Sequence, residues 1–156
     1  MVIRVQIVAR IAMFPLLLWV ALCRPPAAAA DDNLSPLGVW STDGNDSHVK
    51  IEKCGTNLCG VIVWLKQPLG DDGKPAVDSK NPDPNLRSQQ LVGLKLLSGF
   101  EQSSDPNVWK GGKIYDPDDG RTYSCNLTVQ DPKTLKVRGY VGFSLLGKTQ
   151  IWNRVQ

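Results

Sequence analysis

The sequence has few of the residues on which metal centres and catalytic sites are usually built. His48 is its only histidine, which excludes a histidine-rich metal site. Acyl-transfer chemistry is left with a single candidate base, and no G-x-S-x-G sequence exists to expose a nucleophilic serine. His48 follows Asp46 and Ser47 in a polar turn, as a solvated hairpin residue does. The sequence therefore predicts neither an enzymatic activity nor a bound cofactor.

The acidic turns also lack the pattern of a cation-binding loop. Asp43–Asp46, Asp71–Asp72 and Asp116–Gly120 do not match D-x-[DN]-x-[DN]-G with a distal glutamate. Asp-Gly and Asp-Pro pairs are common in ordinary turns. Gly111–Gly112 is followed by strand residues and not by a helix, so it does not form a phosphate-binding loop. No metal is predicted.

Residues 31–156 carry no net charge. Arg4, Arg10 and Arg24 are the only charged residues among the first thirty, and residues 31–156 carry 15 basic and 15 acidic side chains. A neutral domain offers no electrostatic surface for nucleic acid or for an anionic membrane. We therefore expect no nucleic-acid partner.

The apolar run near the N-terminus is too short to span a bilayer. Ile11–Leu22 has 12 residues, whereas a spanning helix needs about 18 or more. Basic residues precede this run and Ala28–Ala30 follows it, which is the order of a cleavable secretory signal. We predict a signal peptide over 1–30, cleavage before Asp31, and an exported domain over 31–156 without stable membrane insertion.

Two alternatives to a cleavable signal fit this segment less well. A retained membrane anchor would need a longer apolar run. A lipoprotein would be acylated at Cys23, but Leu22 stands before it where a small residue is expected.

Export places the remaining cysteines in an oxidising compartment. Cys54 and Cys59 flank a four-residue turn between two strand-like runs, a spacing that favours a disulfide across a hairpin. A metal site is the alternative, although two thiolates without a nearby histidine form a poor ligand set. Cys125 alternates with apolar residues and is interpreted as a buried free thiol.

Short segments of alternating polarity dominate the chain after Asp31, and none reads as a clear amphipathic helix. Turn signals separate about eight of them, and this even, short spacing is typical of an antiparallel barrel or sandwich. The predicted strands are Leu37–Ser41, Val49–Lys53, Leu58–Leu65, Leu91–Phe100, Val108–Tyr115, Tyr123–Val129, Leu135–Phe143 and Thr149–Val155.

One long segment, 66–90, interrupts this series of short segments. It contains four prolines and is too long for a hairpin turn. Asp83 can cap a helix that begins at Pro84, so a short helical turn is predicted over Pro84–Ser88. The rest is either a disordered connection or an ordered lid over one end of the barrel.

Tryptophan and arginine bracket the series of strands. Gly38 and Trp40 stand on the first strand, and Trp152 and Arg154 on the last. A G-x-W near the start with an arginine on the final strand is the bracket of lipocalin-like barrels, in which the guanidinium lies over the indole. The alternative is that both tryptophans are ordinary core residues. Either way, these residues are assigned a structural role.

The chain resembles a secreted bacterial family, that of domain of unknown function 2147. The resemblance spans roughly 36–154 and includes Gly38-x-Trp40, Leu58-Cys59-Gly60, Trp109-x-Gly-Gly-x-Ile-Tyr-Asp-Pro117 and Gln150-x-Trp152-x-Arg154. It implies an all-β, lipocalin-like barrel exported to the periplasm, or secreted, in Gram-negative bacteria. It implies no catalytic motif, and it assigns no role to Cys125.

The predicted function is the binding of a small apolar or amphipathic ligand inside this barrel. An eight-stranded barrel can hold one small ligand or be filled by its own side chains. A filled barrel that serves as a non-catalytic interaction module of the envelope is the alternative. The candidate ligand-binding residues are Ile51, Val61, Val63, Leu94, Leu96, Tyr123, Leu127, Val137 and Phe143.

Overall fold

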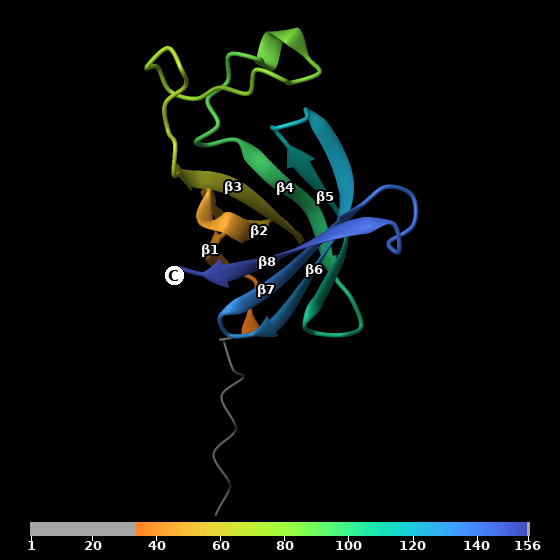
Figure 1. The fold of residues 1–156 in the computed structure, drawn as a ribbon. Helices are drawn as coiled ribbons and strands as arrows, with labels where there is room; N and C mark the ends of the chain where they lie inside the picture. Colours follow the sequence, from red (N-terminus) through yellow and green to blue (C-terminus); the bar gives the residue numbers. More distant parts are fainter. Residues whose placement is uncertain (1–33, 156) are drawn as a thin grey trace, which may run out of the picture.

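Alternating apolar and polar residues form eight strands that close into one antiparallel barrel (Figure 1). The computed structural model describes residues 34–155. The predicted signal peptide and its cleavage site lie outside these residues. The strands are β1 (Gly38–Ser41), β2 (Ser47–Cys54), β3 (Asn57–Leu65), β4 (Lys95–Gln102), β5 (Val108–Asp116), β6 (Arg121–Asp131), β7 (Thr134–Tyr140) and β8 (Gly147–Arg154).

Each strand pairs with its sequence neighbours, and β8 returns to β1 to close the barrel. Trp40 faces Arg154 and Ser41 faces Asn153 across this closing pair. Full closure leaves no unpaired edge strand. The predicted fold class, a single antiparallel barrel of about eight strands, is therefore confirmed.

Only two short 3-10 helices interrupt the strands, η2 (Asp43–Asn45) and η3 (Pro84–Leu86). The Asp83 side chain accepts a hydrogen bond from the Asn85 backbone N–H at 2.9 Å, and Pro84 occupies the first helical turn. The helical turn predicted from Asp83 and Pro84 thus forms. Within residues 34–155, no helix is long and apolar enough to cross a membrane.

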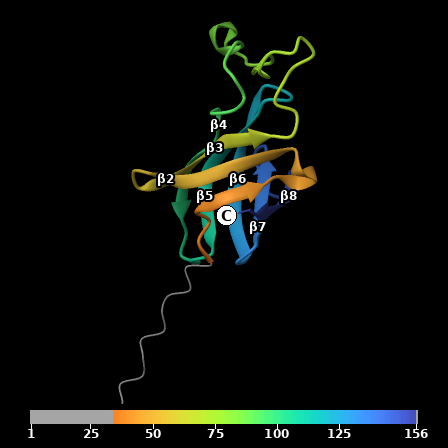
Figure 2. The same ribbon diagram turned by 90° about the vertical axis from the view of Figure 1, so that its left-hand side faces the viewer.

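Successive hairpins alternate between the two ends of the barrel. The connections β1–β2, β3–β4, β5–β6 and β7–β8 gather at one end, called here the open end. The turns β2–β3, β4–β5 and β6–β7 lie at the other, the closed end (Figures 1 and 2). This arrangement follows from the up-and-down topology and brings turns distant in sequence together.

The Arg154 side chain connects separate segments of the chain at the closed end. Its guanidinium carbon lies 4.2 Å from the centroid of the Trp40 ring. Its three nitrogens donate hydrogen bonds to the carbonyl oxygens of Pro132 (2.6 Å), Leu37 (2.7 Å) and Ser35 (2.5 Å). One side chain therefore joins the β6–β7 turn to the segment before β1, in the position that the sequence bracket predicts.

The long β3–β4 segment is folded. Two isolated bridges, Leu69–Pro75 and Val77–Gln90, pair it with itself. Further backbone hydrogen bonds link Ala76 to Pro68 and Leu91 to Ala76, each at 2.9 Å. The segment rises beyond the open end in both views (Figures 1 and 2).

This segment docks on the β5–β6 hairpin through Asp78 and Lys80. Buried Asp78 accepts hydrogen bonds from the Tyr115 hydroxyl at 2.8 Å and from Asn81 Nδ2 at 2.6 Å. Lys80 Nζ donates to the Asp118 carbonyl oxygen at 2.5 Å. Burial, and then the bond to Asp78, raise the pKa of Tyr115 to about 12, so its hydroxyl remains a donor at neutral pH.

Candidate functional site

A cavity of about 800 Å³ opens at the open end of the barrel, where the connections β1–β2, β5–β6 and β7–β8 contribute to its lining. Its walls are apolar side chains that point inward from successive strands, and the residues at its mouth are polar. The apolar walls comprise Ile62, Leu65, Leu91, Leu96, Ile114, Val137 and Trp152, and the tyrosines around it are Tyr115, Tyr123 and Tyr140. A concave apolar site of this size with polar groups at its edge is the usual form of a small-molecule site.

Gly139 helps to keep the cavity open. It lies on β7 among the lining residues, where a side chain would otherwise project into the space. A Cβ atom at this position would approach Ile114 Cγ2 at 3.5 Å, an ordinary contact. The barrel backbone would therefore tolerate a side chain here, and its absence leaves additional space in the cavity.

Large buried side chains pack the interior of the closed half of the barrel, and a second pocket, lined by Leu58, Phe100 and Trp109 among others, opens at that end. Trp40, Phe100, Leu127 and Leu135 are all essentially inaccessible to solvent, and none of them lines the cavity. The two functional alternatives raised by the sequence, a hollow or a filled barrel, thus each describe one half of the interior.

Three of the nine predicted ligand-binding residues line the cavity: Leu96, Tyr123 and Val137. Ile51, Leu94 and Leu127 are buried in the apolar core but do not line it. Leu127 lies opposite Trp109 and Val137 on its neighbouring strands. These three positions stabilise the barrel and do not face the cavity.

The interior placement of Val61 and Val63 was wrong. Ile62, between them, is buried in the core, whereas Val61 is half-buried and Val63 is 40% exposed. The run Leu58–Leu65 is apolar on both faces, so its pattern did not indicate which alternate residues point inward. Register shifts on either side of Gly60 further disturb the alternation.

The interior placement of Phe143 was also wrong. β7 ends at Tyr140, and Phe143 lies in the β7–β8 connection with 79% of its surface exposed. Gly142 adopts a φ of 69°, which turns the chain there. Arg138 holds this connection through hydrogen bonds to the carbonyl oxygens of Ser144 (2.7 Å) and Leu145 (3.2 Å).

Sequence reasoning missed the acidic mouth of the cavity. Asp43 and Asp46 come from the β1–β2 connection, and Asp116, Asp118 and Asp119 from the β5–β6 hairpin. The turn signals themselves were recognised. Their common location follows from the alternation of hairpins between the two ends of an up-and-down barrel.

Tyr123 contributes a hydroxyl to this mouth. It donates a hydrogen bond to the Asp119 carboxylate, and this bond is the largest cause that holds the pKa of Asp119 below its ordinary value. The same bond raises the pKa of Tyr123. Asp119 is therefore ionised and Tyr123 neutral at physiological pH.

The segment 66–90 stands beside the cavity. Leu65 and Leu91, at its two ends, line the cavity, but among the described residues none between 66 and 90 does. It is thus an ordered segment docked on the β5–β6 hairpin, and in this conformation it does not cover the mouth.

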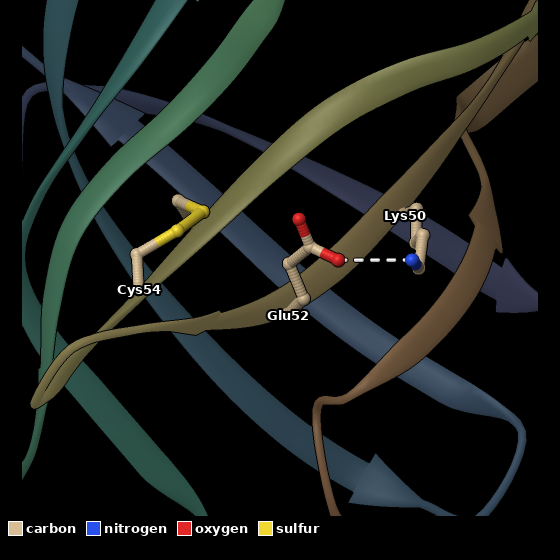
Figure 3. Close-up of a disulfide and its surroundings, with 4 residues drawn as sticks. Lys50, Glu52 and Cys54 are labelled. Atoms are coloured by element: carbon tan, nitrogen blue, oxygen red, sulfur yellow. Dashed lines mark ion pairs between the residues drawn. A yellow bond between two sulfur atoms is a disulfide. The ribbon is translucent and has the colours of Figure 1, made fainter.

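The structure joins Cys54 and Cys59, whose Cα atoms lie 5.8 Å apart across the β2–β3 hairpin (Figure 3). Lys50 and Glu52 form an ion pair of 2.9 Å on the same strand. Cys125 is free and buried on β6, and burial raises the pKa of its thiol to about 12. None of the three cysteines lines the cavity.

These placements predict the thiol chemistry of the exported chain. A thiol reagent at neutral pH should detect no thiol in the native protein, one after denaturation and three after reduction. Rapid labelling of the native protein would show that Cys125 is accessible. Three thiols without reduction would show that Cys54 and Cys59 are not joined.

Nothing in the described part of the chain brings three histidine, cysteine, aspartate or glutamate side chains together as metal ligands. The polar residues of the lining are mainly aspartates and tyrosines, together with Thr42, Ser47, Lys148 and Gln150. This donor set is suited to hold a ligand in place through charge and hydrogen bonds.

A closed eight-stranded antiparallel barrel, open at one end and filled at the other, defines the lipocalin-like class. Residues 38–154 match the family described as "Uncharacterized protein conserved in bacteria (DUF2147)". The chain belongs to this family, as its sequence motifs predict.

The fold is similar to a solved structure described as protein HP1028 from the human pathogen Helicobacter pylori, which belongs to the lipocalin family. The two share 24% sequence identity at a TM-score of 0.66, over 78% of this chain and 84% of the other. Among curated proteins, none matches the sequence.

Proposed function

We propose that this protein is an exported, non-catalytic binding protein that holds a small apolar or amphipathic molecule in the open half of its barrel. The observation that carries the proposal is the cavity of about 800 Å³ with apolar walls. The lipocalin-like fold supports it, since small barrels of this kind can hold one ligand. The signal-like N-terminus supports a location in the periplasm or outside the cell.

A second candidate, an interaction module, is favoured by the β7–β8 connection. Val141, Phe143, Leu145 and Leu146 are all strongly exposed there, and Leu145 is 88% accessible. Four large apolar side chains within six residues form a patch of the kind that marks interaction surfaces. We call it the β7–β8 apolar patch. Val141 and Leu146 of this patch also line the cavity, whereas Phe143 and Leu145 do not, so the experiment must separate the two functions through Phe143 and Leu145.

Titration with Nile red, an uncharged dye that fluoresces in apolar surroundings, makes this separation. We expect the parent protein to bind the dye, and Leu96→Trp to weaken binding at least about tenfold because the indole occupies the cavity. Leu86→Trp, which adds the same ring to the exposed surface of the 66–90 segment, is the matched control and should bind like the parent.

Two results would count against the binding proposal. Unchanged dye binding by Leu96→Trp, together with its loss in a Phe143→Ser, Leu145→Ser variant, would assign the dye to the β7–β8 apolar patch. Absence of binding by the parent would leave the cavity without a ligand function. Circular dichroism of each variant establishes that the barrel remains folded.

A further inference from the structure

The mouth of the cavity carries charge of one sign. Among its lining residues are five aspartates and a single cation, Lys148. The aspartates come from two connections, β1–β2 and β5–β6, and so surround part of the opening. The apolar wall below them has a low dielectric constant, which strengthens the interaction of a bound charge with the carboxylates.

Only some of these carboxylates accept hydrogen bonds that stabilise the turns. Asp116 accepts a hydrogen bond from the Asp118 backbone N–H at 3.0 Å, and Asp119 accepts one from the Arg121 backbone N–H at 2.9 Å. These two groups therefore stabilise the β5–β6 turn. The presence of aspartates at positions 116 and 119 is therefore explained by the structure of this turn.

The other three carboxylates have no such role. Within residues 34–155, no hydrogen bond or ion pair engages the side chains of Asp43 and Asp118, and Asp46 has only an exposed ion pair with Lys66 at 3.6 Å. Lys80 contacts the carbonyl oxygen of Asp118 and not its carboxylate. The charge at the mouth thus exceeds what the turns require.

Aromatic rings accompany the carboxylates. Tyr115, Tyr123 and Tyr140 line the same cavity, and phenol rings attract cations through their faces. Carboxylates and tyrosines together are suited to an ammonium group, whereas an anionic head group would meet repulsion from five aspartates. The apolar walls at the same time require a hydrocarbon or aromatic body.

We propose that the ligand is a cationic amphiphile, with an alkyl or aryl body in the cavity and a protonated or quaternary amine at its mouth. The inference rests on the proposed function, that the cavity is the binding site, and it adds the charge of the ligand. The cavity determines where the ligand binds, and the aspartates determine which head group is preferred.

Three ligands with the same ten-carbon chain test the charge. Calorimetric titration with decyltrimethylammonium, decanol and decanoate, each below its micellar concentration, should rank the cation first and the anion last. Raising the ionic strength from about 0.01 M to about 1 M should reduce the preference, because screening then acts over about 3 Å. Decanol binding should change far less.

Charge-removing variants connect this preference to the mouth. Asp43→Asn, Asp46→Asn and Asp118→Asn together should weaken binding of the cation about 5- to 50-fold, as expected for three solvent-exposed charge interactions, and leave decanol unaffected. The control combines Asp71→Asn, Glu52→Gln and Glu101→Gln, which remove three charges from residues outside the cavity lining. It should bind all three ligands like the parent.

The possible failures are distinguishable. Decanol or decanoate binding as tightly as the cation, or equal losses in both triple variants, would overturn the inference about charge while the cavity remains a binding site. Failure of all three ligands to bind would overturn the proposed function, and the inference with it.

Discussion

Trp40→Ala is expected to lower the free energy of unfolding by about 3–5 kcal/mol, the usual cost of removing a large buried aromatic side chain. Trp40 is fully buried, and its indole Nε1 donates a hydrogen bond to the Pro36 carbonyl oxygen at 2.8 Å. The substitution would leave a cavity beneath the closed end and an unpaired carbonyl. Trp64→Ala is the matched control, because Trp64 is substantially exposed on the outer surface and should cost much less.

Arg154→Ala should cost about 2–3 kcal/mol, because three backbone carbonyls lose a charged donor. The two substitutions should be non-additive in denaturant titrations, since the guanidinium lies directly over the indole. A double variant whose loss equals the sum of the single losses would show that the two side chains do not stabilise one another.

Gly112→Ala should destabilise the barrel by about 1–3 kcal/mol through overpacking. The buried ring of Phe100 packs directly over Gly112 on the neighbouring strand, and a Cβ atom there would clash with three ring carbons. Phe100 could not rotate away without displacing other core side chains.

Gly139→Ala provides the control for this experiment. Its added methyl group would make only ordinary contacts, with Ile114 at 3.5 Å, and would enter the cavity. Its denaturation midpoint should stay near that of the parent. Equal losses by Gly112→Ala and Gly139→Ala would mean that the closed half is packed no more tightly than the open half.

Much of the architecture could be predicted from the sequence because strand and turn signals are local. Residues 123–129 alternate in polarity, and β6 spans them. The Asp83-Pro84 pair defines a cap whose hydrogen bond forms as expected. The bracket of Trp40 and Arg154 fixes how the first and last strands meet.

The inner face of β3 could not be predicted, because Leu58–Leu65 is apolar on both faces. Ile62 is selected for the interior only by tertiary packing, in the core cluster that also contains Leu94 and Leu97. The docking of Asp78 on Tyr115 joins residues 37 positions apart and leaves no periodic signal.

The acidic mouth was, by contrast, within reach of sequence reasoning. Once eight strands are assigned in up-and-down order, the first and fifth connections must lie at the same end of the barrel. Asp43 and Asp118 could then have been placed beside one opening. The volume of the cavity could not, since it depends on how far side chains from several strands fill the interior.

The central claim is that a ligand occupies the open half of the barrel, and methyl-selective NMR during titration with decanol tests it most directly. The account predicts shifts for the methyl groups of Ile62, Leu96, Ile114 and Val137, which line the cavity, and none for Leu127, Val129 or Leu135 in the filled half. Shifts confined to Leu145, which lies in the β7–β8 apolar patch but outside the cavity lining, or no shifts at all, would contradict it.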